Sequence, residues 1–251
     1  MLYVIGLGIH DERDISLRGL EILKDCDEIY AEFYTNVFRG NLGILESLIK
    51  KEIMILERRD MEENPEEGIL RNAVDSKVAL LVPGDPMVAT THIDLILRAR
   101  KLGIKYKIIH ASSIYSAVGE TGLQMYKFGK TSSLVFPEKN YFPTTPYEVL
   151  KENQGAGLHT LFLLDIKSGE KRFMTVNEGI NLLLRMEGIK KGKIFNADTP
   201  CVGIARLGGD SKIKAGKAEE LLKEDFGAPP HILVIPGKLH FMEEEALEIF
   251  R

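Results

Sequence analysis

The chain has 251 residues and a formal net charge of −4; 44% of its residues are hydrophobic and 28% are charged. These values predict a well-packed globular protein with one large α/β domain or two smaller domains. The acidic balance argues against tight general binding to nucleic acid, which needs a basic surface. We therefore expect no direct nucleic-acid binding, although a basic groove within an acidic whole is compatible with this charge.

The hydrophobic runs and the cysteines predict a cytoplasmic protein. The apolar run after Met1 is too short for a signal peptide, and no stretch approaches the length that spans a membrane. Cys26 and Cys201 lie far apart without C-x-x-C spacing, which suits a reducing compartment and predicts two buried small apolar residues. The six histidines form no H-x-x-x-H pair on an expected helix, and no metal site is predicted.

Strand and helix patterns alternate through the first half of the chain. The expected strands span 2–5, 28–33, 53–56, 78–82 and 106–110, and the expected helices follow Asp14 or Ser16 and span about 42–50, 66–76 and 88–101. This alternation predicts an α/β fold with a mostly parallel sheet that helices cover on both faces.

Two glycines follow the first strand in the sequence G-L-G-I at 6–9. A dinucleotide fingerprint needs a third glycine at position 11, where this chain has Asp11, so a nicotinamide-dependent oxidoreductase is poorly supported. The two glycines indicate a close approach of the backbone either to a ligand or to a neighbouring strand.

The turn Pro83-Gly84-Asp85-Pro86 ends the apolar run at 78–82. The prolines fix φ, the glycine permits close approach to a ligand, and Asp85 supplies a negative charge. Ligands of open α/β sheets bind outside the carboxyl ends of strands, which is where this turn is expected. The alternative is a rigid connection in which Asp85 caps the next helix.

A second polar segment, A-S-S-I-Y at 111–115, follows the strand at 106–110. Ser112 or Ser113 offers hydrogen-bonding groups to a ligand, or caps the next helix. Residues 122–130 then lack a strong pattern, and we place a domain boundary there, with domains at 1–128 and 129–251.

The second half of the chain predicts a mixed sheet. Strands are expected at 132–136, 159–165, 201–205 and 232–235, with a hairpin arm at 211–215, and helices near 147–153, 177–186 and 217–224 and from 241. The proline-rich and aromatic segment at 137–147 is too long for a simple connector, and loops of this kind often cover a site.

The ordered set of G-x-G, P-G-D-P and A-S-S-I-Y resembles the tetrapyrrole methylase superfamily. The segments at 84–92, 112–130, 157–167 and 224–240 are similar to the diphthine synthase family within it, and the first strand extends the similarity to nearly the whole chain. The resemblance implies two domains with a mostly parallel first sheet, a mixed second sheet and S-adenosylmethionine bound in the cleft between the domains.

The resemblance also implies an activity. Members of the family methylate the amino group of a 3-amino-3-carboxypropyl histidine on elongation factor 2, and trimethylation yields diphthine in diphthamide biosynthesis. A homodimer is implied as well. The number of methyl groups and methylation of the carboxylate stay open, as do three other readings: a corrin-precursor or ribosomal RNA methylase, the oxidoreductase, and a non-catalytic module that binds the factor.

Carried over by residue, the resemblance places the cofactor against one set of positions in this chain: Ile9, Asp85, Val88, Ser113, Ile114, Leu164, Ala205 and His231. The last three end or begin strands, where side chains also pack cores whatever the function. No catalytic residue is assigned. Asp165 or a tyrosine is a candidate acceptor for the proton that an amine nucleophile must lose, and the ring of Tyr115 is a candidate to face the ammonium.

Overall fold

The structure is a computed structural model that describes residues 1–139 and 141–251. It divides into two compact units, Met1–Ala117 and Val118–Arg251. The boundary expected at residue 128 lies within the second unit. Residues 118–128 contact the rest of the second unit; for example, the backbone N–H of Gln124 donates to the carboxylate of Glu243 at 2.8 Å.

The first unit contains a parallel sheet with the strand order β3-β2-β4-β1-β5. Its strands are β1 (Leu2–Gly6), β2 (Glu28–Glu32), β3 (Met54–Leu56), β4 (Val78–Val82) and β5 (Tyr106–Ile109). Strand β4 is central and fully buried: Val78 and Leu80 join the core on one face, and Ala79 and Leu81 join the core on the other. The predicted strands and their parallel arrangement are confirmed.

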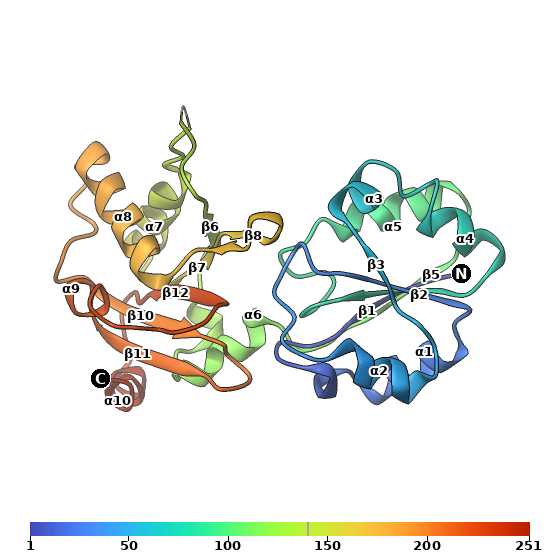
Figure 1. Ribbon diagram of the computed structural model, residues 1–251. Helices are drawn as coiled ribbons and strands as arrows, with labels where there is room; N and C mark the ends of the chain where they lie inside the picture. Colours follow the sequence, from blue (N-terminus) through green and yellow to red (C-terminus); the bar gives the residue numbers. More distant parts are fainter. Residues whose placement is uncertain (140) are drawn as a thin grey trace. The chain divides into compact units, whose positions relative to one another are not determined.

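Helices cover both faces of this sheet, as predicted (Figure 1). One face packs against α1 (Leu17–Asp25) and α2 (Leu42–Ile49), and the other against α3 (Arg58–Glu62), α4 (Ile69–Asp75) and α5 (His92–Lys101). The unit also contains a 3₁₀ turn at Glu12–Asp14 and ends with α6 (Ile114–Ala117).

Two local features of this unit differ from what the sequence predicted. Helix α5 begins at His92 rather than near residue 88, because Ala89 has a left-handed φ of 55° and the Thr90 hydroxyl donates to the carbonyl of Pro86 at 2.6 Å. Helix α3 was not predicted, since five residues are too few to show a helical period. Of the two possible caps of α1, Ser16 is the one observed: its hydroxyl oxygen accepts from the Gly19 N–H.

The second unit contains a mixed sheet with the strand order β11-β10-β12-β7-β6. Its strands are β6 (Ser132–Leu134), β7 (Thr160–Leu164), β10 (Pro200–Ala205), β11 (Lys212–Lys217) and β12 (His231–Ile235). Only the β6–β7 pair is parallel in this described sheet. The predicted hairpin is confirmed as the antiparallel pair β10–β11, and so is the mixed character of the sheet.

The helices of the second unit are α7 (Thr145–Gly155), α8 (Val176–Lys190), α9 (Ala218–Leu221) and α10 (Phe241–Glu248). Helices α7 and α8 lie on the same face of the sheet (Figure 1) and pack into its core through Leu150 and Leu183. The remaining described elements are the pair β8 (Ile166–Lys167) and β9 (Arg172–Phe173), which was not predicted, and the 3₁₀ turns Val118–Thr121, Met125–Lys127 and Ser168–Glu170. Residue 140, within the segment expected to cover a site, lies outside the described residues, and that role stays a prediction.

Two further expectations concern the cysteines and the membrane. Cys26 and Cys201 are both buried in the cores, as predicted, and burial raises the pKa of the Cys26 thiol to about 11 and raises that of Cys201 as well. Within the described ranges, no helix combines the length and the apolar character required to cross a membrane.

Candidate functional site

The loops after β1 and β4 are joined through two glycines. The Gly84 N–H donates to the Gly8 carbonyl at 2.7 Å, and the Gly8 N–H donates to the Gly84 carbonyl at 3.2 Å. Both residues have a positive φ, of 82° at Gly8 and 75° at Gly84, which favours glycine. A Cβ added to Gly84 would meet no heavy atom within 4 Å, so there is space beside the backbone of this turn.

The same two loops pack closely against the loop after β5, and Gly6 makes this possible. A Cβ at Gly6 would lie 2.5 Å from the carbonyl oxygen of Gly84 and 2.7 Å from the Cβ of Ala111. No side chain fits there without displacing the backbone. The absence of a side chain at Gly6 therefore lets the three loops meet at the carboxyl ends of β1, β4 and β5.

Asp85 connects two of these loops through its side chain, which is 7% exposed. Its Oδ1 accepts from the Met87 N–H at 2.9 Å, while its Oδ2 accepts from the Ala111 N–H at 3.1 Å and lies 2.8 Å from Nδ1 of His110. Asp85 does not cap α5, which excludes the capping alternative for this residue. The carboxylate instead fixes the turn after β4 to the loop after β5.

The other expected cofactor residues of the first unit lie on the same loops. The Ile9 N–H donates to the carboxylate of Asp14 at 3.2 Å, and the Val88 N–H donates to the Asp85 carbonyl at 3.1 Å. Ser113 precedes α6, and its carbonyl accepts from the Ala117 N–H at 2.9 Å; Ile114 is the first residue of that helix. The structure thus brings the five expected residues of this unit together, four on three adjoining loops and Ile114 at the start of α6.

Three expected residues of the second unit lie at one end of its sheet. Ala205, at the end of β10, pairs with His231, at the start of β12. Ile232 pairs with Leu163, so Leu164 ends β7 at the same end of the sheet. All three expected residues are buried.

The imidazole of His231 holds the loop that precedes β12. Its Nε2 lies 3.1 Å from the carbonyl oxygens of both Gly227 and Ala228, and its Nδ1 accepts from the Val176 N–H at 3.4 Å. Carbonyls only accept, so the proton is on Nε2. Burial lowers the pKa of His231, which keeps the ring neutral at neutral pH. Both ring nitrogens are therefore occupied by protein groups.

Comparisons with known proteins place this geometry in a family. A model of the tetrapyrrole (corrin/porphyrin) methylases matches residues 1–222. The chain belongs to the tetrapyrrole methylase family. It is 53% identical to the diphthine synthase of Methanocaldococcus jannaschii, over 99% of this chain and 98% of that protein, and 49% identical to the diphthine synthase of Methanococcus maripaludis, over 99% and 98%.

Solved structures agree with this assignment. A candidate diphthine synthase from Entamoeba histolytica superposes with a TM-score of 0.92 at 42% identity, covering 100% of this chain and 98% of that chain. A further diphthine synthase structure has a TM-score of 0.90 at 40% identity, covering 99% and 95%. The predicted fold, family and enzyme class are confirmed: this tetrapyrrole methylase family member is a methyltransferase.

Arg206 is a structural residue of the methylase that the sequence did not single out. Its guanidinium Nη1 donates to the carbonyls of Phe226 and Ala228, each at 2.7 Å, and its Nε donates to the carboxylate of Asp210 at 3.0 Å. Its side chain is 11% exposed and its φ is 53°. Arg206, directly after β10, and His231, at the start of β12, thus hold the same loop. The only signal in the sequence was the R-L-G-G segment directly after a buried strand.

Asp165 also forms hydrogen bonds with backbone groups of neighbouring segments. Its Oδ2 accepts from the Phe136 N–H at 2.8 Å, its N–H donates to the Leu134 carbonyl at 3.0 Å, and its carbonyl accepts from the Met174 N–H at 2.9 Å. These bonds connect the segments that follow β6 and β9. The side chain is half-buried, and Oδ2 is already occupied by a backbone donor.

Proposed function

We propose that this methyltransferase acts on elongation factor 2, where it adds methyl groups to the amino group of a 3-amino-3-carboxypropyl histidine and forms diphthine. The observation that supports this most is the 53% identity to a diphthine synthase over 99% of the chain. The similarity covers both units and both groups of expected site residues. A match confined to the turn after β4 would support only the family.

The methyl donor in this proposal is S-adenosylmethionine. The resemblance assigns residues of each unit to its binding: Ile9, Asp85, Val88, Ser113 and Ile114 in the first unit, and Leu164, Ala205 and His231 in the second. Two features fit such a ligand. The turn at Gly84 has open space beside its backbone, and the apolar members of the set offer surfaces for an adenine ring.

Asp85 has a defined part in this binding. Three donors from the chain already occupy its two oxygens, and a carboxylate has about four lone-pair sites, so it retains capacity for a ligand donor. Its internal bonds also fix its position before the ligand binds. A preorganised acceptor loses less conformational freedom on binding than a mobile one.

When bound, S-adenosylmethionine supplies a methyl group from its sulfonium. The sulfur leaves as a neutral thioether, so the protein need not donate a proton to it. The chain's contribution is to orient the amine against the methyl carbon and to exclude water. Such positioning can lower a barrier by about 7 to 11 kcal/mol. The amine must lose a proton before each attack. Asp165 stays a candidate acceptor through Oδ1, and Tyr115, which is 40% exposed, stays a candidate to face the ammonium.

The proposal includes a homodimer that works in the cytoplasm with elongation factor 2 as its protein substrate. The resemblance to the diphthine synthase family supports the dimer and the substrate, and the hydrophobic runs and cysteines of the sequence support the location. Sedimentation velocity at micromolar concentration tests the dimer, and a single species with the mass of one chain would contradict it.

Turnover tests the proposed reaction. The protein is incubated with S-adenosylmethionine and elongation factor 2 that carries the unmethylated 3-amino-3-carboxypropyl histidine, and S-adenosylhomocysteine is measured. We expect release with this factor and none with a factor whose target histidine is unmodified. Release with neither factor, despite binding of S-adenosylmethionine, would assign the substrate to another methylase of the family. Docking with the factor without cofactor binding would indicate a non-catalytic module.

A further inference from the structure

The turn after β4 is held by Thr90 and by His92, the first residue of α5. Nδ1 of His92 lies 3.2 Å from the carbonyl oxygen of Pro86, and the Thr90 hydroxyl donates to the same oxygen at 2.6 Å. A carbonyl only accepts, so His92 donates through Nδ1–H. The side chain of His92 is 1% exposed, so bulk solvent does not compete for this bond.

The second ring nitrogen of His92, Nε2, carries no proton in this tautomer. Burial lowers the pKa of His92, so the neutral ring carries one proton and Nε2 has a lone pair. Nε2 makes no hydrogen bond with the residues that the structure describes, and the nearest carboxylate oxygen, Oε1 of Glu32, lies 3.5 Å away. Glu32 is itself fixed, because it accepts from the backbone N–H groups of Tyr34 and Thr35 at 3.1 Å each.

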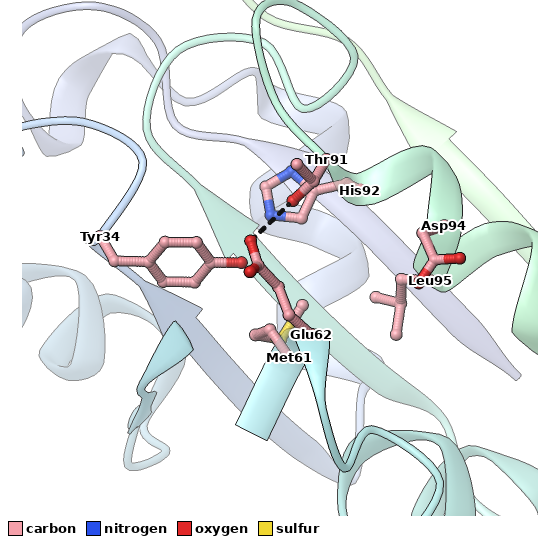
Figure 2. A pocket seen from close by; sticks show the side chains of 7 residues that line it. All are labelled: Tyr34, Met61, Glu62, Thr91, His92, Asp94 and Leu95. Carbon is pink, nitrogen blue, oxygen red and sulfur yellow. Dashed lines mark hydrogen bonds between the residues drawn. The ribbon is translucent and has the colours of Figure 1, made fainter. Parts of the chain in front are cut away.

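A small polar pocket adjoins the His92 ring (Figure 2). The Tyr34 hydroxyl, the Glu62 carboxylate and the Thr91 hydroxyl converge beside the ring, and Thr91 donates to Glu62 at 3.2 Å. The pocket volume of about 30 Å³ has room for a water molecule and not for a cofactor. His92 therefore acts on the candidate site through its hydrogen bond to Pro86 and not through this pocket.

We propose that His92 is a positioning residue of the methyl-donor site: its Nδ1–H fixes the Pro86 carbonyl and with it the turn that presents Asp85 and Val88. The turn needs such support because Ala89, in its last part, has a left-handed φ that a residue with a Cβ rarely adopts. This inference rests on the proposed function, since it assigns the turn to the methyl donor. It adds a residue outside the set that the resemblance implied.

Substitutions at His92 separate its two nitrogens. His92→Asn retains an amide N–H at the position of Nδ1, whereas His92→Gln moves the amide to the position of Nε2 and His92→Leu retains volume without a donor. By calorimetry, we expect the Asn variant to bind S-adenosylmethionine within about threefold of the wild type, and the Gln and Leu variants to bind at least about tenfold more weakly. In turnover, KM for the donor rises while kcat at saturation changes little.

Amide hydrogen exchange tests the positioning role without any ligand. The Met87 and Val88 N–H groups both bond to Asp85. Their exchange is expected to accelerate in His92→Gln and His92→Leu and to stay near the wild-type rate in His92→Asn. Leu97→Asn, at a half-exposed position of α5, is the matched control and leaves both amides protected. Thr90→Val removes the second donor to Pro86 with little change in shape, and we expect it to accelerate exchange of the same two amides. It is the variant to measure if the His92 variants do not fold.

The two readouts distinguish the ways of failing. Accelerated exchange in a protein whose wild type binds no S-adenosylmethionine would contradict the proposed function and leave the support of the turn intact. Unchanged exchange and affinity in folded His92→Leu and Thr90→Val would overturn the positioning role. Equal losses in Asn, Gln and Leu that follow their melting temperatures would overturn it too, since packing alone would then explain them.

Discussion

The carboxylate of Asp85 accepts a hydrogen bond from the backbone N–H of Ala111 at 3.1 Å and so joins the turn after β4 to the loop after β5. The two residues are far apart in the sequence and lie on the loops that follow β4 and β5, the two strands that flank β1. The candidate site of the first unit therefore depends on a tertiary contact that neither loop contains by itself.

Asp85→Ala is expected to weaken binding of S-adenosylmethionine by at least about tenfold. The substitution leaves the part-buried N–H groups of Met87 and Ala111 without their acceptor, and an unsatisfied group that stays out of water costs about 1 to 3 kcal/mol. Calorimetric titration measures the affinity and thermal unfolding checks the fold. Asp25→Ala, which removes an exposed carboxylate paired with Lys77, is the control. Wild-type affinity in a folded Asp85→Ala variant would contradict the role of this residue.

Gly6→Ala is expected to lower both stability and donor affinity. The new methyl group would lie 2.5 Å from the carbonyl of Gly84 and must displace the turn, at a cost of about 1 to 3 kcal/mol. Denaturant unfolding and calorimetry measure the two effects. Gly188→Ala adds the same methyl group within α8, where a Cβ meets nothing within 4 Å, and is expected to stabilise the protein by about 0.5 to 1 kcal/mol. Equal responses of the two variants would exclude the packing argument.

Arg206→Lys is expected to loosen the loop before β12 and to weaken donor binding severalfold. A lysine ammonium has no planar fork and cannot reproduce the bonds to Phe226, Ala228 and Asp210 together. Hydrogen exchange at Gly227 and a donor titration measure the effects. Arg13→Lys, at a side chain that is 83% exposed, retains the charge and serves as the control. A variant Arg206→Lys with wild-type exchange and affinity would show that charge alone suffices at this position.

Stability below neutral pH is expected to depend on Glu243, which is fully buried in the second unit. Burial raises the pKa of its carboxyl, but hydrogen bonds from Lys127, Gln124, His240 and His159 outweigh burial and lower the pKa to about 2, from 4.5. A lowered folded-state pKa means that the unfolded chain binds the proton more readily. The stabilisation is therefore complete above pH 4.5 and is lost as the pH falls toward 2.

Glu243→Gln tests this dependence. The variant is expected to be about 3 to 5 kcal/mol less stable at neutral pH, because the Lys127 ammonium loses its buried partner. The difference in unfolding free energy between wild type and variant is expected to shrink as the pH falls from 4.5 toward 2. Denaturant titrations across this range measure it, and Glu148→Gln, an exposed partner of Lys190, is the control. A difference that does not change with pH would show that Glu243 is not ionised in the folded state.

Local sequence patterns were sufficient to predict most of the fold. The apolar run at 78–82 predicted a strand, and the structure shows that strand buried on both faces, as a continuous apolar run favours. The hairpin of β10 and β11 also followed from local signals. The short helix α3 and the pair β8–β9 did not, since segments of two to five residues carry too little period to detect.

The candidate site was predictable only in part. The turn chemistry at Asp85 indicated a special loop, while the resemblance supplied Leu164, Ala205 and His231. The roles of Gly6, His92 and Arg206 depend on contacts between segments distant in sequence. In the sequence, a buried histidine at the start of a helix has the same appearance as a surface one, so only the structure assigns it a partner.

Mass spectrometry of elongation factor 2 after incubation with this protein and S-adenosylmethionine tests the central claim most directly. The factor must carry the unmethylated 3-amino-3-carboxypropyl histidine. We predict mass gains in steps of one methyl group, confined to that histidine and reaching trimethylation of its amine, with any further step marking methylation of the carboxylate. A factor whose mass stays unchanged, while the protein demonstrably binds S-adenosylmethionine, would contradict the proposed substrate.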